Sequence, residues 1–132
     1  MKSFSLLLSS ALLLAVACTD HSSTTVVDVA KAKSLLAEQA GQLQIVDLRT
    51  PPEVTATGTL PGATAINFRS ADFAGQIEKL DKKRPVLIYC AAGSRSAQAG
   101  NIFKQAGFST IYDMSPGMNG WLAAGEQTKP LQ

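Results

Sequence analysis

Short apolar runs alternate with helix-like segments from Val26 to the end of the chain, and this alternation constrains the fold more than any other feature. The runs expected to form strands are residues 26–29, 44–48, 63–68, 85–89 and 110–112. The segments expected to form helices are residues 30–39, a segment from 51 onward, 73–80, 95–106 and 118–124. Strands that alternate with helices are typical of a mostly parallel sheet with helices on both faces. The sequence therefore predicts one α/β domain over residues 26–132, built around a central five-stranded sheet.

The first 17 residues have the features of an export signal. Lys2 supplies positive charge, and the apolar stretch from Phe4 to Val16 is shorter than the roughly 20 residues that a membrane-spanning helix needs. Two cleavage sites overlap at its end. Residues 15–17 (Ala-Val-Ala) suit ordinary signal removal, whereas residues 14–18 (Leu-Ala-Val-Ala-Cys) resemble a bacterial lipobox, in which the cysteine is lipidated. We favour the lipobox, because a cysteine directly after a site that also suits simple cleavage would otherwise be a coincidence.

This reading predicts a bacterial protein exported to the periplasmic side and held at a membrane by acyl chains on Cys18. Residues 18–25 are polar and are expected to form a flexible tether between the anchor and the domain. If Cys18 is acylated, Cys90 is the one free thiol of the mature protein. Exported proteins usually pair their cysteines in disulfides, so an unpaired cysteine that is retained indicates a chemical function.

The charge and the motifs of the sequence argue against several classes of partner and cofactor. The formal net charge is +2, and the Lys and Arg residues are scattered, so no nucleic-acid partner is expected. No Cys or His lies near Cys90 at the spacing of a zinc site. A Gly-rich nucleotide fingerprint is also missing. We therefore expect neither a metal nor a cofactor.

Two strand-to-helix loops are candidate sites, because ligands of parallel sheets bind beyond the carboxyl ends of the strands. The first loop is Asp47–Glu53. It contains a helix start in which Thr50 is the N-cap, Pro51 takes the first helical position and Glu53 completes a capping box. The second loop is Cys90–Ser96, which follows the most apolar strand of the chain.

The second loop has the composition of an anion-binding turn. Its residues are Cys90, Ala91, Ala92, Gly93, Ser94, Arg95 and Ser96. Small residues let the backbone curl so that successive N–H groups point at one spot, and Gly93 can take a positive φ. A thiol inside such a ring, at the positive end of a helix, is biased toward the reactive thiolate. A buried structural cysteine would not need this turn.

Four motifs together resemble the single-domain rhodanese family in order and spacing. They are Val46–Glu53 (VDLRTPPE), Leu60–Ala63 (LPGA), Val86–Ser96 (VLIYCAAGSRS) and Gly117–Trp121 (GMNGW). The resemblance covers nearly the whole chain from Val26 onward. It implies a rhodanese-like fold and a sulfurtransferase that moves sulfane sulfur from a small anion such as thiosulfate to cyanide or a thiol. It also implies that Cys90 is the nucleophile that becomes a persulfide, and that the main-chain N–H groups of residues 91–96 cradle it.

The roles of the charged residues near the two loops can be interpreted in more than one way. Arg95 is the candidate either to attract an anionic donor or to brace the loop, because its planar fork suits oxyanions. Arg49 and Asp47 are possible supporting residues. Arg49 either adds positive potential at the site or pairs with Asp47 or Glu53 as scaffolding, and we favour the pairing. The basic turn at residues 82–84 is expected to be solvated, although it offers charge that would steer an anion if it lay near the site.

Rival functions share parts of this pattern. Cysteine-dependent phosphatases and arsenate reductases resemble it, but they place five residues between Cys and Arg, and this chain has four between Cys90 and Arg95. A disulfide oxidoreductase lacks support because no Cys-x-x-Cys motif exists. A non-enzymatic rhodanese module that binds a partner or senses sulfide is the remaining alternative, and the retained cysteine and complete loop argue for chemistry instead.

Overall fold

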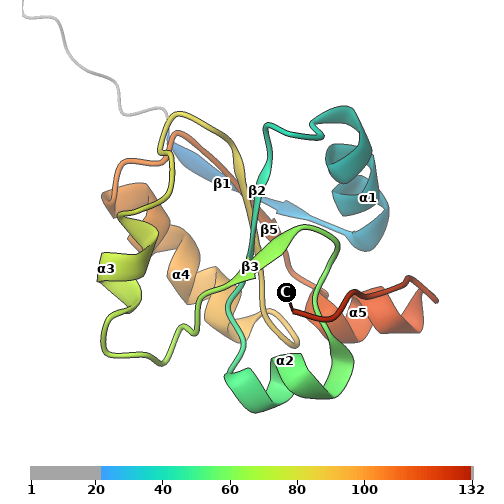
Figure 1. Ribbon diagram of the computed structural model, residues 1–132. Helices are drawn as coiled ribbons and strands as arrows, with labels where there is room; N and C mark the ends of the chain where they lie inside the picture. The colour runs from blue at the N-terminus through green and yellow to red at the C-terminus, as the bar shows by residue number, and fades with distance from the viewer. Residues whose placement is uncertain (1–21, 132) are drawn as a thin grey trace, which may run out of the picture.

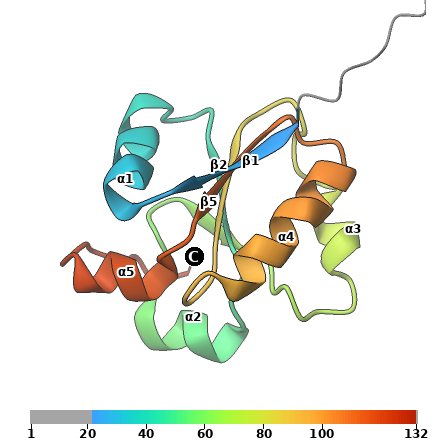
Figure 2. The same cartoon turned by 180° about the vertical axis from the view of Figure 1, so that it is seen from behind.

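Five parallel strands form the centre of the computed structural model, which describes residues 22–131 (Figures 1 and 2). Their order across the sheet is β1-β5-β4-β2-β3, and every strand pairing is parallel. The elements in chain order are β1 (Ser23–Val27), α1 (Val29–Glu38), β2 (Gln44–Asp47), α2 (Pro51–Thr57), β3 (Ala63–Ala65), α3 (Phe73–Ile77), β4 (Val86–Tyr89), α4 (Ser94–Gln105), β5 (Thr110–Met114) and α5 (Gly117–Ala123). The predicted α/β class and the central five-stranded sheet are confirmed.

Helices cover both faces of the sheet, so its central strand is apolar throughout. Helices α3 and α4 lie on one face, and α1 and α5 lie on the other (Figures 1 and 2). All four residues of β4 are buried. Val86 and Ile88 pack under α3 and α4, whereas Leu87 and Tyr89 pack under α1 and α5. Cys90, the next residue, belongs to the cluster under α3 and α4.

The aromatic residues form part of this core, as expected from the sequence. Phe103 and Phe108 are fully buried and lie with ring centroids 5.0 Å apart. Phe68 packs against the same cluster from its edge, and Trp121 is buried on the opposite face. These four aromatic side chains thus pack in the core on the two faces of the sheet, and we assign none of them a role in binding a ligand.

The first strand begins earlier than predicted. The expected strand at residues 26–29 is present at the edge of the sheet, but it ends at Val27 because Asp28 caps α1: its Oδ1 accepts the N–H of Lys31 at 2.7 Å. The strand extends back to Ser23. The tether prediction for residues 18–25 is corrected accordingly, since Ser23, Thr24 and Thr25 pair with β5. These polar residues suit an edge strand, where backbone hydrogen bonds rather than side-chain burial hold the strand.

The leader, its cleavage site and Cys18 lie outside the described residues. Within residues 22–131 no helix is long and apolar enough to cross a membrane.

Strand β3 is shorter than the predicted 63–68. Two hydrogen bonds continue its alignment with the end of β2, from Ile66 N–H to Asp47 O and from Phe68 N–H to Leu48 O, before a turn leads to α3.

One carboxyl group is buried in this core without full pairing. Asp113 of β5 is 2% exposed, and its Oδ1 has no hydrogen-bond partner. It stands opposite Ile88 in the register of β4 and β5. Burial raises the pKa of Asp113, and the nearby Ser96 hydroxyl lowers it by a smaller amount. A buried group of this kind destabilises the folded state when it is charged.

We expect Asp113→Asn to increase the free energy of unfolding at pH 7 by about 1 kcal/mol. The folded-state pKa lies above the unfolded one, so wild-type stability falls as pH rises through that interval. The gain from the uncharged Asn should therefore shrink below about pH 4, where Asp113 is protonated in both states. Urea unfolding of the wild type and of Asp113→Asn, at pH 7 and below pH 4, measures this difference in the free energy of unfolding. Glu38→Gln, at an exposed position on α1, is the control and should change little. A loss of stability at pH 7 would contradict the expectation.

Candidate active site

The two candidate loops lie side by side because their strands are neighbours. Strand β2 pairs with β4 so that Asp47 stands opposite Tyr89. The pairing continues one step further, where the N–H of Leu48 donates to the carbonyl of Tyr89 at 2.9 Å. The loop of residues 47–53 and the loop of residues 90–96 therefore leave the same edge of the sheet together, where parallel-sheet ligand sites form.

Cys90 lies buried within its loop, with 1% of its surface exposed. The N–H of Gly93 donates to its Sγ at 3.1 Å, and the Sγ lies 3.8 Å from the hydroxyl of Ser96. Burial raises the pKa of the Cys90 thiol, but hydrogen bonds from the backbone of Ser96, Gly93 and Ala92 and from the Ser96 hydroxyl outweigh it. The net result is a pKa below the ordinary cysteine value, so the loop stabilises a thiolate.

Gly93 gives the loop its curl. Its φ is +101°, in the left-handed region, and a Cβ added there would lie 2.5 Å from the carbonyl oxygen of Ser115. The residues from Ser94 onward already belong to the first turn of α4. Ser94 is exposed, whereas Ser96 is buried and donates its hydroxyl hydrogen to the Gly93 carbonyl at 3.1 Å. The thiol therefore faces the amino end of a 12-residue helix.

Helix α5 orients the outer side of the loop. The N–H of Met118 donates to the carbonyl of Cys90 at 2.8 Å, and that of Asn119 donates to the carbonyl of Ala91 at 3.0 Å. Gly117 permits this approach, because a Cβ there would lie 2.5 Å from both carbonyl oxygens. With its carbonyls bound to α5, the loop presents its N–H groups to the sulfur. The sequence marked Gly117 as part of a motif but did not indicate that it supports the Cys90 loop.

Arg95 is joined to the other loop by a two-fold hydrogen-bonded ion pair. Its Nη1 and Nη2 donate to the two carboxylate oxygens of Glu53 at 2.8 and 2.7 Å. Glu53 also accepts the N–H and hydroxyl hydrogens of Thr50 at 2.9 and 2.7 Å, within the predicted capping box of α2. Hydrogen bonding to Arg95 holds the pKa of Glu53 well below its usual range. These contacts support the interpretation that Arg95 braces the loop. Glu53 first, and then the Cys90 thiol, raise the pKa of Arg95, so its guanidinium also lies close to the sulfur.

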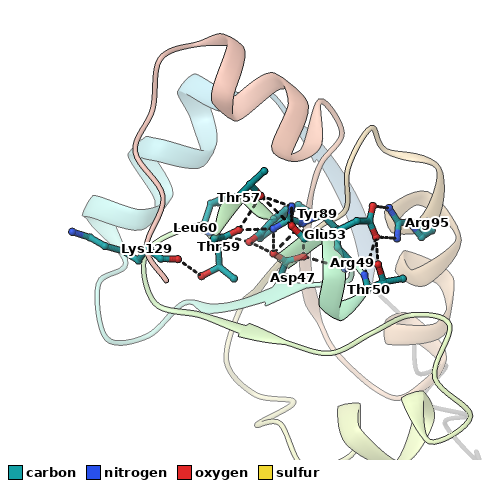
Figure 3. A network of polar contacts seen from close by, with 11 residues as sticks. Asp47, Arg49, Thr50, Glu53, Thr57, Thr59, Leu60, Tyr89, Arg95 and Lys129 are labelled. Atoms are coloured by element: carbon teal, nitrogen blue, oxygen red, sulfur yellow. Dashed lines mark hydrogen bonds and ion pairs between the residues drawn. The ribbon is translucent and has the colours of Figure 1, made fainter. Parts of the chain in front are cut away.

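Asp47 and Arg49 form a buried ion pair, as the pairing interpretation expected (Figure 3). Nη2 of Arg49 lies 2.6 Å from Oδ2 of Asp47, and the two side chains are 3% and 0% exposed. Tyr89 donates its hydroxyl hydrogen to the same Oδ2 at 2.7 Å. Burial, and then the charge of Asp47, raise the pKa of Tyr89 well above its usual range, so it remains a neutral donor.

The same pair fixes the end of α2. Arg49 donates to the Thr57 hydroxyl at 2.8 Å and to the Gly58 carbonyl at 2.6 Å, and Tyr89 accepts the N–H of Leu60 at 3.0 Å (Figure 3). Arg49 is 3% exposed and its charge is paired with Asp47, so the contacts favour the pairing interpretation over steering. Its role is structural.

Two further expectations concern charge around the site. The basic turn at residues 82–84 precedes β4, so it lies at the opposite end of that strand from Cys90 and cannot steer an anion to the loop. Within residues 22–131, no group of three His, Cys, Asp or Glu residues is arranged to hold a metal ion. What the site offers is one activated thiol inside a ring of backbone donors, which suits covalent chemistry on sulfur.

Comparisons with known proteins agree with this geometry. The sequence model of the rhodanese-like domain matches residues 28–124. A thiosulfate sulfurtransferase, GlpE, from Pseudomonas aeruginosa is 37% identical over 90 residues, which cover 64% of this chain and 78% of that protein. A sulfurtransferase from Allochromatium vinosum is 32% identical over 81 residues, covering 61% of this chain and 73% of the relative.

Solved structures resemble the fold closely. A rhodanese-like domain from Anabaena superposes with a TM-score of 0.69 at 25% identity, over 80% of this chain and 78% of that one. A polysulfide-sulfur transferase homodimer from Wolinella succinogenes gives a TM-score of 0.68 at 27% identity over the same shares of the two chains. The expected family resemblance is thereby confirmed.

We expect the Cys90 thiol to ionise below the pH at which a free cysteine does, about 8.5, because its folded-state pKa is lowered. In a Cys18→Ser chain, the pH dependence of alkylation by iodoacetamide should have a lower midpoint when the protein is folded than in urea. Ser96→Ala should raise the folded midpoint, since it removes the hydroxyl but keeps the N–H. A folded midpoint equal to that in urea would show that the loop does not stabilise the thiolate.

Proposed function

The chain belongs to the rhodanese-like domain family, and from that premise we propose that it is a sulfurtransferase in which Cys90 carries sulfane sulfur as a persulfide. The observation that carries the proposal is the ring around Sγ, where the Gly93 N–H approaches to 3.1 Å at the amino end of α4. Such donors stabilise the thiolate before reaction and a persulfide anion after it. Two relatives named as sulfurtransferases support the same chemistry.

The proposed cycle needs no proton transfer, which suits a site without a histidine base in its described residues. The Cys90 thiolate attacks the outer sulfur of a donor such as thiosulfate. The sulfur–sulfur bond of the donor breaks, and sulfite leaves with the electron pair. The persulfide anion then gives its terminal sulfur to cyanide or to a thiolate, and the Cys90 thiolate returns. Each step conserves charge, so the loop must stabilise one negative charge throughout.

The spacing of the loop argues against a phosphatase, because four residues separate Cys90 from Arg95 where cysteine-dependent phosphatases have five. Arg95 gives two of its five N–H donors to Glu53, which holds it against the other loop. A module that only binds a partner would not need a buried thiol that accepts the Gly93 N–H at 3.1 Å at the amino end of α4, so the geometry at Cys90 favours catalysis over binding.

Intact-mass analysis tests the persulfide directly. After incubation with thiosulfate, the chain with Cys18→Ser should gain the mass of one sulfur atom, and cyanide should remove it with the appearance of thiocyanate. Cys90→Ser should show neither the adduct nor thiocyanate. Because Cys90 is the only remaining cysteine in this background, the adduct has one possible site. Absence of an adduct with thiosulfate and with a second sulfane donor would contradict the proposed function.

We further propose that the protein is exported and anchored to a membrane on the periplasmic side by acyl chains on Cys18. The support is the sequence alone: a charged start, a short apolar stretch and Leu-Ala-Val-Ala before the cysteine at position 18. The anchor would place the sulfur-carrying domain close to the membrane surface.

Expression of the full chain in a Gram-negative host separates lipidation from simple cleavage. We expect the protein in the membrane fraction, with an N-terminal peptide whose mass includes acyl chains on Cys18. Cys18→Ser should move it to the soluble fraction, whereas Cys90→Ser should leave its location unchanged. A mature chain that starts at an unmodified Cys18 would exclude the anchor.

A further inference from the structure

The guanidinium closest to the nucleophile is already neutralised by the protein itself. Arg95 gives both of its Nη groups to Glu53, and its side chain is only 12% exposed. Glu53 is fixed in turn by the N–H and hydroxyl of Thr50. A carboxylate with these four hydrogen bonds is pre-organised, and it holds Arg95 in place without any ligand.

Three other basic sites do not replace Arg95 at the thiol. Arg49 is buried and paired with Asp47. The basic turn at residues 82–84 lies at the opposite end of β4. Arg69 is exposed and follows β3, which is separated from β4 by the whole of β2, so solvent and salt screen it. The charges of Arg95, Glu53 and the Cys90 thiolate therefore sum to minus one, which disfavours the approach of a multiply charged anion.

We propose that Glu53 is a specificity-determining residue, which neutralises Arg95 and so makes Cys90 select sulfur donors of low charge over dianions such as thiosulfate. This inference rests on the proposed sulfur transfer and deepens it. Glu53 acts through Arg95 and does not touch the reacting sulfur, so its effect should depend on the charge of the donor and not on the chemistry of the transfer.

Two donors of similar shape isolate the charge. Thiosulfate carries two negative charges, and methanethiosulfonate carries one, with a methyl group in place of one oxygen. In both cases the Cys90 thiolate attacks the outer sulfur and the donor's sulfur–sulfur bond breaks. Sulfite or methanesulfinate leaves with the electron pair, and the same Cys90 persulfide anion forms. The ratio of kcat/KM for the two donors therefore reports how the site treats one extra charge.

Glu53→Gln is the informative substitution. Glutamine keeps the capping box of α2 but cannot neutralise Arg95. In the full chain with Cys18→Ser, we expect kcat/KM for thiosulfate to rise on the order of tenfold, and that for methanethiosulfonate to rise less, so that their ratio shifts toward the dianion. Glu78→Gln is the matched control, because it removes the same charge from an exposed pair with Lys82 at the far end of the sheet. It should leave the ratio unchanged.

Two further measurements keep the test decisive. The double variant Glu53→Gln, Arg95→Gln restores the wild-type net charge and should restore the wild-type donor ratio. In the wild-type protein, kcat/KM for thiosulfate should stay level or rise with ionic strength, because the charges of Arg95, Glu53 and the Cys90 thiolate sum to minus one. This measurement needs no variant and holds even if Glu53→Gln folds poorly.

The outcomes separate this inference from the proposed function. If both donors load Cys90 but Glu53→Gln leaves their ratio unchanged, or if wild-type activity with thiosulfate falls steeply with salt, the role of Glu53 is overturned and sulfur transfer stands. If neither donor forms a persulfide, the proposed function itself fails.

Discussion

The buried pair of Asp47 and Arg49 is the interaction on which the rest of the site depends. Both side chains are almost fully shielded from water, so each needs the other: removal of one partner would leave an uncompensated charge in the interior. The pair also binds Tyr89 and the backbone after α2. Through these contacts it fixes α2 against the carboxyl ends of β2 and β4, and this placement brings Glu53 opposite Arg95.

The reactive loop is shaped from two sides by helix ends. Helix α4 places its amino terminus behind Cys90, and α5 binds the carbonyls of Cys90 and Ala91 through its first N–H groups. With the carbonyls occupied, the N–H groups of the turn are left to face the sulfur. The thiolate is therefore stabilised by backbone geometry, and no side-chain base is required for it to form. This explains how Gly117, far along the chain from Cys90, belongs to the same site.

Much of the fold and of the candidate site could be predicted from the sequence. The features that could not be predicted have a common physical cause. The apolar run of β4, the helix start at Thr50 and the small residues after Cys90 are local patterns, and local patterns predicted the sheet and the loop. The pairing of Glu53 with Arg95 joins residues 42 positions apart, and no local pattern reveals it. The start of strand β1 was misplaced because its polar residues are held by backbone pairing with β5. Asp113 gave no signal, because a single acid in a short apolar strand has the same pattern whether its neighbours satisfy it or not.

The double use of Glu53 links the start of α2 to the chemistry of the loop. One carboxylate caps the helix and also holds the guanidinium of Arg95, so the loop is braced before any donor arrives. In the proposed sulfur transfer, a fixed ring of N–H donors would not have to reorganise as Cys90 accepts sulfur. The same brace removes the charge that would otherwise attract an anion. In this protein, rigidity of the loop and attraction of charged donors are therefore opposed properties, and the Glu53–Arg95 pair favours rigidity.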